Sequence, residues 1–165
     1  MPEEFAIRTG TLEDAEIVVA HRRAMFLDMG YRDDEVLNRM CEAFRPWLLR
    51  KMQAGEYLAW FAVVQGGNNH GAIAASAGLW LMDWPPHMLG PGRWRGNILN
   101  VYTRSESRRN GLARRLTEVA VEWCRANQVS IVILHASDAG RPIYQSMGFE
   151  PSTEMRMALK VDSEA

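Results

Sequence analysis

The stretch from Asn97 to Leu134 constrains the fold more than any other part of this sequence. Residues 97 to 103 and 129 to 134 are rich in apolar and β-branched side chains, as buried strands are. Between them, apolar residues recur at helical spacing over Gly111 to Asn127, at Leu112, Leu116, Val119, Ala120 and Trp123. A strand, a helix and a second strand in this order predict one βαβ crossover, with its two strands parallel in one sheet.

The remaining segments predict a mixed set of helices and strands. Thr11 with Asp14 resembles a helix N-terminal capping signal, and Pro46 is expected to bend or interrupt the second helix. The pattern predicts a strand at Phe5–Arg8, helices at Leu12–Met29 and Asp34–Gly55, a hairpin of Tyr57–Val64 and Ala72–Met82, a loop at Asp83–Gly92, a short helix at Ala139–Met147 and a last strand at Ser152–Val161. We therefore expect a single α+β domain over residues 1–165.

Composition excludes several classes of protein. The net charge is −1, which gives no global attraction to nucleic acid. The longest apolar run, Tyr57 to Val64, has eight residues, whereas a membrane span needs about 20. The acidic start of the chain does not resemble a signal peptide, and Cys41 and Cys124 lack the spacing of metal ligands. A cytoplasmic protein without a metal site, a nucleic-acid partner or a membrane partner is expected.

Positive charge is concentrated in one part of the chain. Seven arginines and a single acid, Glu106, lie between Arg93 and Arg115. A local cationic stretch in a neutral protein suits a small polyanion better than a long one.

The loop before the helix of the crossover is a candidate phosphate site. The first amides of a helix point to one spot, and the helix dipole adds positive charge there. Gly111 and Ala113 are small, so a ligand can approach the backbone closely. The chemistry equally allows Asn110-Gly111 to be only a turn. Neither GxxxxGK[ST] nor GxGxxG occurs, so the two standard nucleotide loops are excluded.

Two motifs together resemble a known family. The loop Arg108-Arg109-Asn110-Gly111-Leu112-Ala113 follows a strand and has the form [Q/R]-x-x-G-x-[G/A], and the segment Ile143 to Phe149 places a tyrosine, Tyr144, shortly before Gly-Phe. Both are similar to the motifs of the GCN5-related N-acetyltransferases (GNAT family), in the usual order. The resemblance implies a mixed, mostly antiparallel sheet flanked by helices, in which the βαβ crossover forms the acetyl-CoA site.

The resemblance also implies the residues that hold acetyl-CoA, which would lie in a V-shaped gap between the two crossover strands. The pantetheine arm would pair with the backbone of Val101 and Tyr102, and the pyrophosphate would sit on the loop residues Arg108, Arg109, Asn110, Gly111, Leu112, Ala113 and Arg114. Ser137 stands where many relatives carry asparagine, and a serine can still donate one hydrogen bond.

The mechanism implied is direct attack of a neutral amine on the thioester. Tyr144 matches the position of the family's general acid, and stabilising the departing thiolate is its expected role because a phenol is a weaker acid than a thiol. The sequence does not decide which group removes the proton from the amine. Asp83 or His135 could accept it directly, and Asn100 could position a water that does so. A lone histidine such as His21 has the same ambiguity between a structural and a chemical role.

The acceptor is expected to be the amine of a small molecule or peptide, with a homodimer possible. Its site would be built from the first two helices and the loop after the hairpin, where apolar and aromatic residues are plentiful: Met25, Phe26, Met29, Tyr31, Trp80, Met82, Trp84 and Trp94. Two other classes compete, a domain that binds acyl-CoA without turnover and a nucleic-acid module that uses the arginines. Neutral total charge disfavours the second of these.

Overall fold

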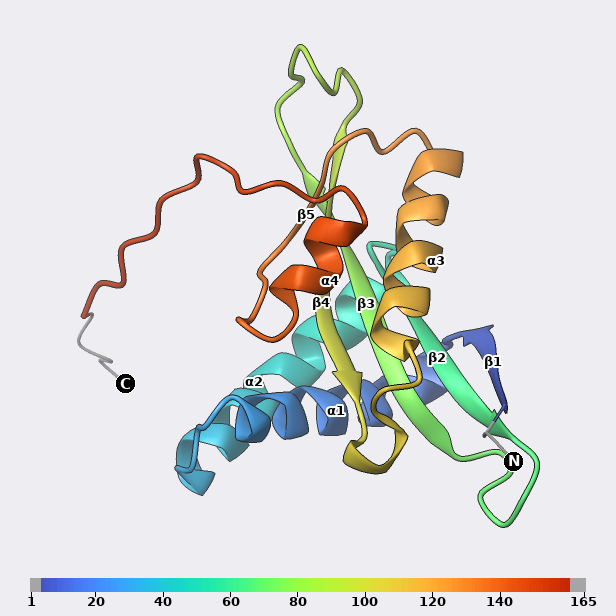
Figure 1. Ribbon diagram of the computed structural model, residues 1–165. Coiled ribbons are helices and arrows are strands. Elements are labelled where there is room, and N and C mark those ends of the chain that lie inside the picture. Colours follow the sequence, from blue (N-terminus) through green and yellow to red (C-terminus); the bar gives the residue numbers. More distant parts are fainter. Residues whose placement is uncertain (1–3, 161–165) are drawn as a thin grey trace. The chain divides into compact units, whose positions relative to one another are not determined.

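The protein is described from a computed structural model that covers residues 4–160. Two compact units make up the chain, one ending at His135 and one beginning at Ala136, and each is described by itself. The first unit contains a five-stranded sheet in the order β1-β2-β3-β4-β5 (Figure 1). Its strands are β1 (Glu4–Thr9), β2 (Tyr57–Gln65), β3 (Ile73–Asp83), β4 (Trp94–Thr103) and β5 (Val132–Leu134).

The sheet is antiparallel except at one edge. Strands β1 to β4 pair antiparallel with their neighbours, whereas β5 pairs parallel with β4. The helix α3 (Leu112–Ala126) connects β4 to β5. This arrangement confirms the predicted α+β class, the hairpin and the βαβ crossover.

Both crossover strands differ in length from the prediction. β4 starts at Trp94 rather than Asn97, because Trp94 continues the antiparallel ladder opposite Asp83. β5 starts at Val132 rather than Val129, because the Val129 amide donates to the Cys124 carbonyl (2.8 Å) and closes the end of α3.

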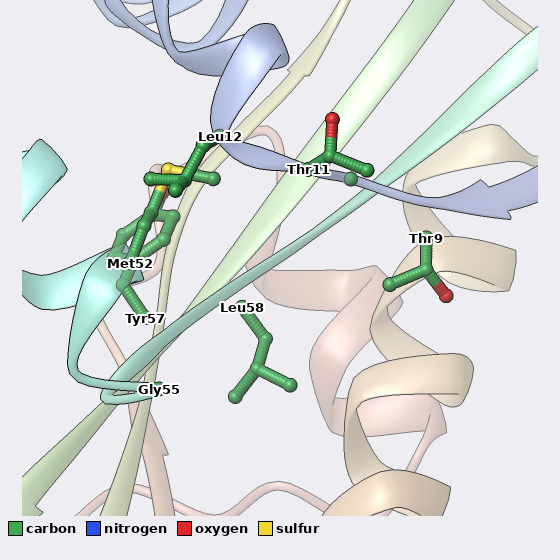
Figure 2. A pocket seen from close by; sticks show the side chains of 8 residues that line it. Thr9, Thr11, Leu12, Met52, Gly55, Tyr57 and Leu58 are labelled. Atoms are coloured by element: carbon green, nitrogen blue, oxygen red, sulfur yellow. The ribbon is translucent and has the colours of Figure 1, made fainter.

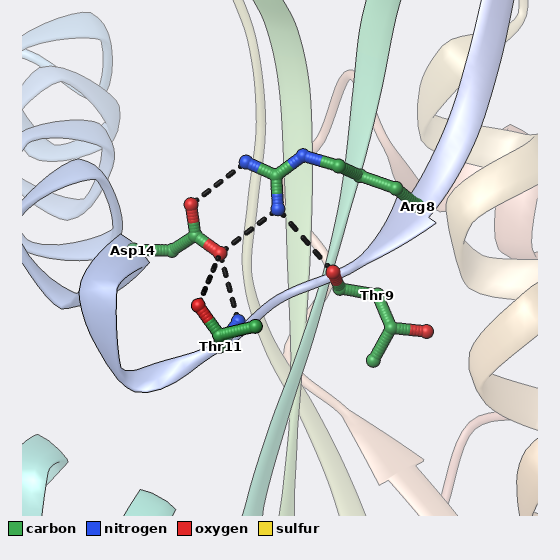
Figure 3. A network of polar contacts seen from close by, with 4 residues as sticks. All are labelled: Arg8, Thr9, Thr11 and Asp14. Atoms are coloured by element: carbon green, nitrogen blue, oxygen red, sulfur yellow. Dashed lines mark hydrogen bonds and ion pairs between the residues drawn. The ribbon is translucent and has the colours of Figure 1, made fainter.

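Helix α1 (Ala15–Asp28) follows the 3-10 turn η1 (Leu12–Asp14), so the predicted first helix begins with a tighter turn. The Asp14 carboxylate accepts from the Thr11 amide (2.7 Å), as the capping signal predicts. It also accepts two hydrogen bonds from Arg8 at 2.7 and 2.8 Å (Figure 3). The hydrogen bonds from Arg8 have the largest effect on the pKa of Asp14, and together with that from Thr11 they hold it below its usual value, although burial alone would raise it. The network fixes the end of β1 to the start of α1.

Helix α2 (Asp34–Gln53) is continuous through Pro46, so of the two predicted effects, a bend or an interruption, the interruption does not occur. Pro46 is exposed, and water can therefore satisfy the carbonyl whose helical partner the proline removes. The Asp33 side chain accepts from the Val36 amide (3.1 Å) and caps the start of this helix.

Helices cover both faces of the sheet (Figure 1). On one face α1 lies against β4 and α2 against β2, around a cluster that includes Val18, Phe44, Leu48 and Phe61. On the other face α3 packs closely enough that a Cβ at Gly96 would lie 3.2 Å from Cys124 Sγ.

The second unit contains one short helix, α4 (Arg141–Ser146), where Ala139–Met147 was predicted. The predicted strand Ser152–Val161 is wrong over residues 152–160, and Val161 lies outside the described residues. A strand needs a neighbour to satisfy its backbone, and the apolar side chains of Met155, Met157 and Leu159 are 95%, 81% and 72% exposed. Alternation of apolar residues therefore predicted a pairing that the described residues do not make.

Candidate active site

Strand β4 contains a bulge close to the point where β5 ends. Ser76 faces Tyr102 and Gly78 faces Leu99, so two residues of β4, Asn100 and Val101, stand opposite one residue of β3. Asn100 has φ +55°, a left-handed conformation that asparagine adopts more readily than most residues. The bulge thus redirects the strand at its centre.

Beyond the bulge, β4 continues without β5 beside it. The parallel pairing runs only from Gly96 opposite Val132 to Ile98 opposite Leu134, whereas β4 extends to Thr103. The edge of β4 over residues 99–103, which includes Val101 and Tyr102, is therefore not covered by β5.

The bulge places a polar side chain inside the molecule. Asn100 is 4% exposed, and it donates to the Tyr57 hydroxyl (2.8 Å) and accepts from Arg22 Nη1 (2.7 Å). A Cβ on Gly78 would lie 2.0 Å from the Tyr57 hydroxyl oxygen, so this network requires glycine there. Burial raises the pKa of Tyr57 to about 12, and the phenol stays protonated.

A second buried pair lies on the same face. His21 Nδ1 and Ser76 Oγ are 2.6 Å apart, and the His21 ring stacks obliquely on Tyr102 with centroids 4.9 Å apart. Burial, with a smaller contribution from the charge of Arg104, lowers the pKa of His21 to about 4. His21 is therefore neutral at pH 7, and its buried Nε2 has no hydrogen-bond partner among the described residues.

The loop between β4 and α3 presents backbone amides. Gly111 (φ +69°) and Arg109 (φ +64°) are both left-handed, and nothing lies within 4 Å of the place where a Gly111 Cβ would be. In the described part of the chain, the amides of residues 109 to 113 have no backbone acceptor, and the next bond is from the Arg115 amide to the Gly111 carbonyl (3.0 Å). Asn110 donates to the Ser107 carbonyl (3.0 Å) and braces the loop.

The seven arginines of the 93–115 stretch do not form one cluster. Arg93 and Arg95 stack on Trp94 and Trp84 at the start of β4. The other five follow the opposite end of β4, which is ten residues long, so about 30 Å of strand separates the two groups. Within the second group, Arg108 pairs with Asp28 and Arg114 with Glu118.

The two other candidate bases lie at different distances from the bulge. Asp83 is opposite Trp94, six strand residues from Asn100 and hence roughly 20 Å away, and its carboxylate lies 3.5 Å from Arg93. His135 follows Leu134, which pairs with Ile98, so it comes directly after the last β4–β5 pair, and its side chain is exposed. Of the two, only His135 is close to the uncovered edge of β4.

Tyr144 and Ser137 belong to the second unit. The Tyr144 ring meets Phe149 edge to face with centroids 6.0 Å apart, and Ser137 Oγ accepts from the Gly140 amide (3.1 Å). A Cβ on Gly140 would lie 3.0 Å from the Tyr144 ring and 3.3 Å from Ser137 Oγ. Within this unit both residues therefore lie close to Gly140.

The apolar residues expected at the acceptor end are divided. Trp80 packs edge to face on Trp47 (centroids 5.3 Å apart), which makes it part of the core. Met29 and Tyr31, at the turn between α1 and α2, are each 55% exposed.

A pocket of about 220 Å³ lies at another place in the first unit (Figure 2). It is lined by Thr9, Gly10, Thr11, Leu12, Met52, Gly55, Tyr57 and Leu58. These residues carry no carboxylate, amine or imidazole, and the Tyr57 hydroxyl already binds Asn100. The pocket therefore offers no group for acid–base chemistry.

Within residues 4–160, no three His, Cys, Asp or Glu side chains gather in a way that could hold a metal ion. No helix in that range is both long and apolar enough to cross a membrane.

Comparison with known proteins identifies the family. The model of the acetyltransferase (GNAT) family matches residues 23–149. A GCN5-related N-acetyltransferase from Ralstonia eutropha JMP134 is 35% identical with a TM-score of 0.84, over 94% of this chain and 99% of that one. A predicted acetyltransferase with acetyl-CoA from Clostridium acetobutylicum is 25% identical with a TM-score of 0.78, over 94% and 96% of the two chains.

A more distant structure, glucosamine-6-phosphate N-acetyltransferase from Arabidopsis thaliana, has 20% identity and a TM-score of 0.64 over 97% of this chain and all of that one (100%), and it supports the fold alone. No curated protein matches the sequence significantly. The chain belongs to the GNAT family of acetyltransferases, which use acetyl-CoA.

Arg22, Tyr57 and Ser76 are site residues that sequence reasoning did not single out. Each lies outside the family motifs and inside an ordinary helix or strand pattern. The glycine at residue 78 within strand β3 is a local signal that another group approaches the strand closely there. It does not indicate that this group is the Tyr57 hydroxyl.

Proposed function

We propose that the protein transfers the acetyl group of acetyl-CoA directly to the amine of a small molecule or peptide. One observation carries the proposal: the uncovered edge of β4 over residues 99–103 leads into a loop whose amides 109–113 lack backbone acceptors. A strand edge can pair with an amide-containing arm, and a helix start can hold a pyrophosphate. Family membership supports acetyl-CoA as the ligand that combines both groups.

The loop fits this co-substrate in its own geometry. Open space above Gly111 allows close approach of a phosphate, and the left-handed Arg109 and Gly111 turn the chain into the start of α3. The proposed contacts are the backbone of Val101 and Tyr102, the loop residues 108–114, and Ser137.

Acetyl transfer requires a neutral amine. The amine nitrogen bonds to the thioester carbonyl carbon, the carbon–sulfur bond breaks, the nitrogen loses a proton and the thiolate gains one. Deprotonating an alkylamine of pKa near 10.4 at pH 7 costs about 4–5 kcal/mol, so a base or a water chain is useful. We assign this task to His135 or to a water, because Asp83 is remote and the Asn100 amide is held by Arg22 and Tyr57.

Turnover of acetyl-CoA with a panel of amines, read as free thiol, tests the proposal. Release of thiol that depends on an amine supports it. Binding of acetyl-CoA without turnover for every amine would instead favour a domain that binds acyl-CoA without reaction.

The loop assignment is tested by Gly111→Val, with Gly55→Val as the matched control. Both glycines have φ +69° and open space where a Cβ would be, so valine is forced into a left-handed backbone at either position. Only residue 111 faces the proposed pyrophosphate. We expect Gly111→Val to weaken acetyl-CoA binding at least about tenfold by calorimetry, and Gly55→Val to leave it unchanged. Equal affinities in the two variants would refute the assignment.

The role of Tyr144 is tested by Tyr144→Phe, which keeps the ring that packs on Phe149. Loss of a group that stabilises the thiolate in the transition state should lower kcat by about 10²-fold, or roughly 2.7 kcal/mol, with acetyl-CoA affinity unchanged. A wild-type kcat under conditions where chemistry limits the rate would make Tyr144 a packing residue only.

A further inference from the structure

Arg22 is a partly buried cation that has no carboxylate partner among the residues the structure describes. Its Nη1 donates to Asn100 Oδ1 (2.7 Å), and its guanidinium lies over the rings of Phe44 (4.6 Å) and Phe26 (5.0 Å). The Nε atom is buried and has no hydrogen-bond partner in the described part of the chain. Burial lowers the pKa of Arg22, and the neighbouring Tyr57 phenol adds no negative charge at pH 7 because burial raises its pKa to about 12.

The neighbouring arginine behaves differently. Arg23 comes next on α1 and pairs with Asp34 (2.5 Å). Arg8, Arg45 and Arg108 likewise each meet an acid. Arginine remains charged in proteins, so the positive charge of Arg22 stays in place without a described anion to balance it.

Arg22 lies beside the uncovered edge of β4, where its charge can bind a ligand. Asn100, which holds it, is the bulge residue directly before Val101 on the uncovered edge of β4. Two aromatic rings and one hydrogen bond fix the direction of the guanidinium, while the residue stays partly exposed. A preorganised guanidinium that solvent reaches in part is a receptor for a planar anion.

We propose that Arg22 binds a carboxylate of the acceptor, so that the acceptor is a compact amine that also carries a carboxylate, such as an α-amino acid. This inference rests on the proposed function, because it concerns the amine that receives the acetyl group. Amine and carboxylate are only a few bonds apart in such a molecule, as the closeness of Arg22 to the edge of β4 requires.

A carboxylate fits this site better than a phosphate. Arg22 supplies one positive charge, and the nearby His21 adds none because it is neutral at pH 7. A phosphate monoester carries close to two negative charges, of which one would stay unbalanced. The aromatic rings of Phe26 and Phe44 beside the guanidinium also suit an acceptor with an apolar side chain.

The experiment compares four amines in the full-length protein: L-phenylalanine, L-phenylalaninamide, phenethylamine and O-phosphoethanolamine. We expect kcat/KM to be highest for L-phenylalanine, by about tenfold or more over its amide. Arg22→Gln should lower kcat/KM for the amino acid by about 10- to 100-fold, the effect of losing a charge-assisted hydrogen bond, and change that for the amide by less than about threefold. Arg23→Gln, the matched control, should leave both unchanged.

The ratio of kcat/KM for L-phenylalanine to that for L-phenylalaninamide distinguishes carboxylate binding by Arg22 from a merely structural role. If Arg22→Gln acted only by disturbing Asn100, it would lower both kcat/KM values together and leave their ratio intact, which would overturn the proposal. Arg22→Lys keeps the charge and should retain part of the preference even if Arg22→Gln folds poorly. Preference for the amide, for phenethylamine or for O-phosphoethanolamine in the wild type would also overturn it.

Failure of the proposed function has a different signature. If no amine is acetylated although acetyl-CoA binds, acetyl transfer to amines is refuted. The carboxylate site is then judged by binding alone: L-phenylalanine should raise the melting temperature of the wild type and of Arg23→Gln but not of Arg22→Gln, and equal shifts in all three would overturn it.

Discussion

The two faces of the sheet in the first unit are built from different chemistry. The face covered by α3 buries almost only apolar side chains, among them Leu79, Ile98, Leu112, Leu116 and Ala120. The face covered by α1 and α2 has an apolar cluster too, but near β4 it also buries His21, Asn100, Ser76 and the Tyr57 hydroxyl, with Arg22 partly buried beside them.

This difference separates stability from binding. Apolar burial stabilises the fold by about 25 cal/mol per Å², whereas a buried polar group costs free energy unless it is fully bonded. His21 Nε2 and Arg22 Nε are buried without described partners, so the face of α1 carries a cost that the face of α3 does not. Such a cost is expected where a protein binds a polar ligand.

The largest effect is expected on the apolar face, from Leu116→Ala. Leu116 is 0% exposed, and removing its buried methyl groups leaves a cavity under α3. We expect a loss of about 3–4 kcal/mol in the free energy of unfolding, measured by urea denaturation, without a change in the preference among acceptors. A changed preference would show that the two faces are not independent.

The next effect concerns pH and the polar face. Because the pKa of His21 is about 4 in the fold and near 6.5 in the unfolded chain, the unfolded state binds the proton first as pH falls. Neutral His21 therefore contributes fully to the free energy of unfolding above about pH 6.5. As the pH falls to about 4, the protein progressively loses this contribution, roughly 3 kcal/mol in total. Unfolding curves at intervals of pH should show this slope.

His21→Gln should flatten the curve over that window. Asp14 cannot produce the same slope, because its pKa is lowered from 3.8 and its contribution is lost only at more acidic pH. An identical slope in His21→Gln would assign the effect to other groups.

The smallest effect is expected from Tyr57→Phe. This change removes the hydroxyl that accepts from Asn100 Nδ2 (2.8 Å) and leaves that buried donor without its partner. We expect a loss of about 1–2 kcal/mol in the free energy of unfolding. The acceptor preference should also weaken, because Asn100 holds Arg22. A destabilised variant with unaltered preference would separate the network from acceptor binding.

Sequence patterns predicted those parts of the protein that depend on local periodicity. The amphipathic spacing of α3 and the β-branched strand after it fixed the crossover, and Gly-Asn-rich residues between two apolar runs predicted the hairpin. The loop motif placed the small residue Gly111 at the start of α3, and this residue has φ +69°. These features are encoded by neighbours a few residues apart along the chain.

Tertiary structure decided the features that depend on residues far apart. Nothing in the sequence around Arg22 indicates that it meets Asn100, 78 residues away, or that Tyr57 fills the space over Gly78. The seven arginines seemed one group because they are close in sequence, yet β4 carries two of them to its other end. A residue's charge and hydrogen-bonding capacity are set by its type, but its partners and burial are set by which strands and helices pack together, and these long-range contacts leave no local pattern.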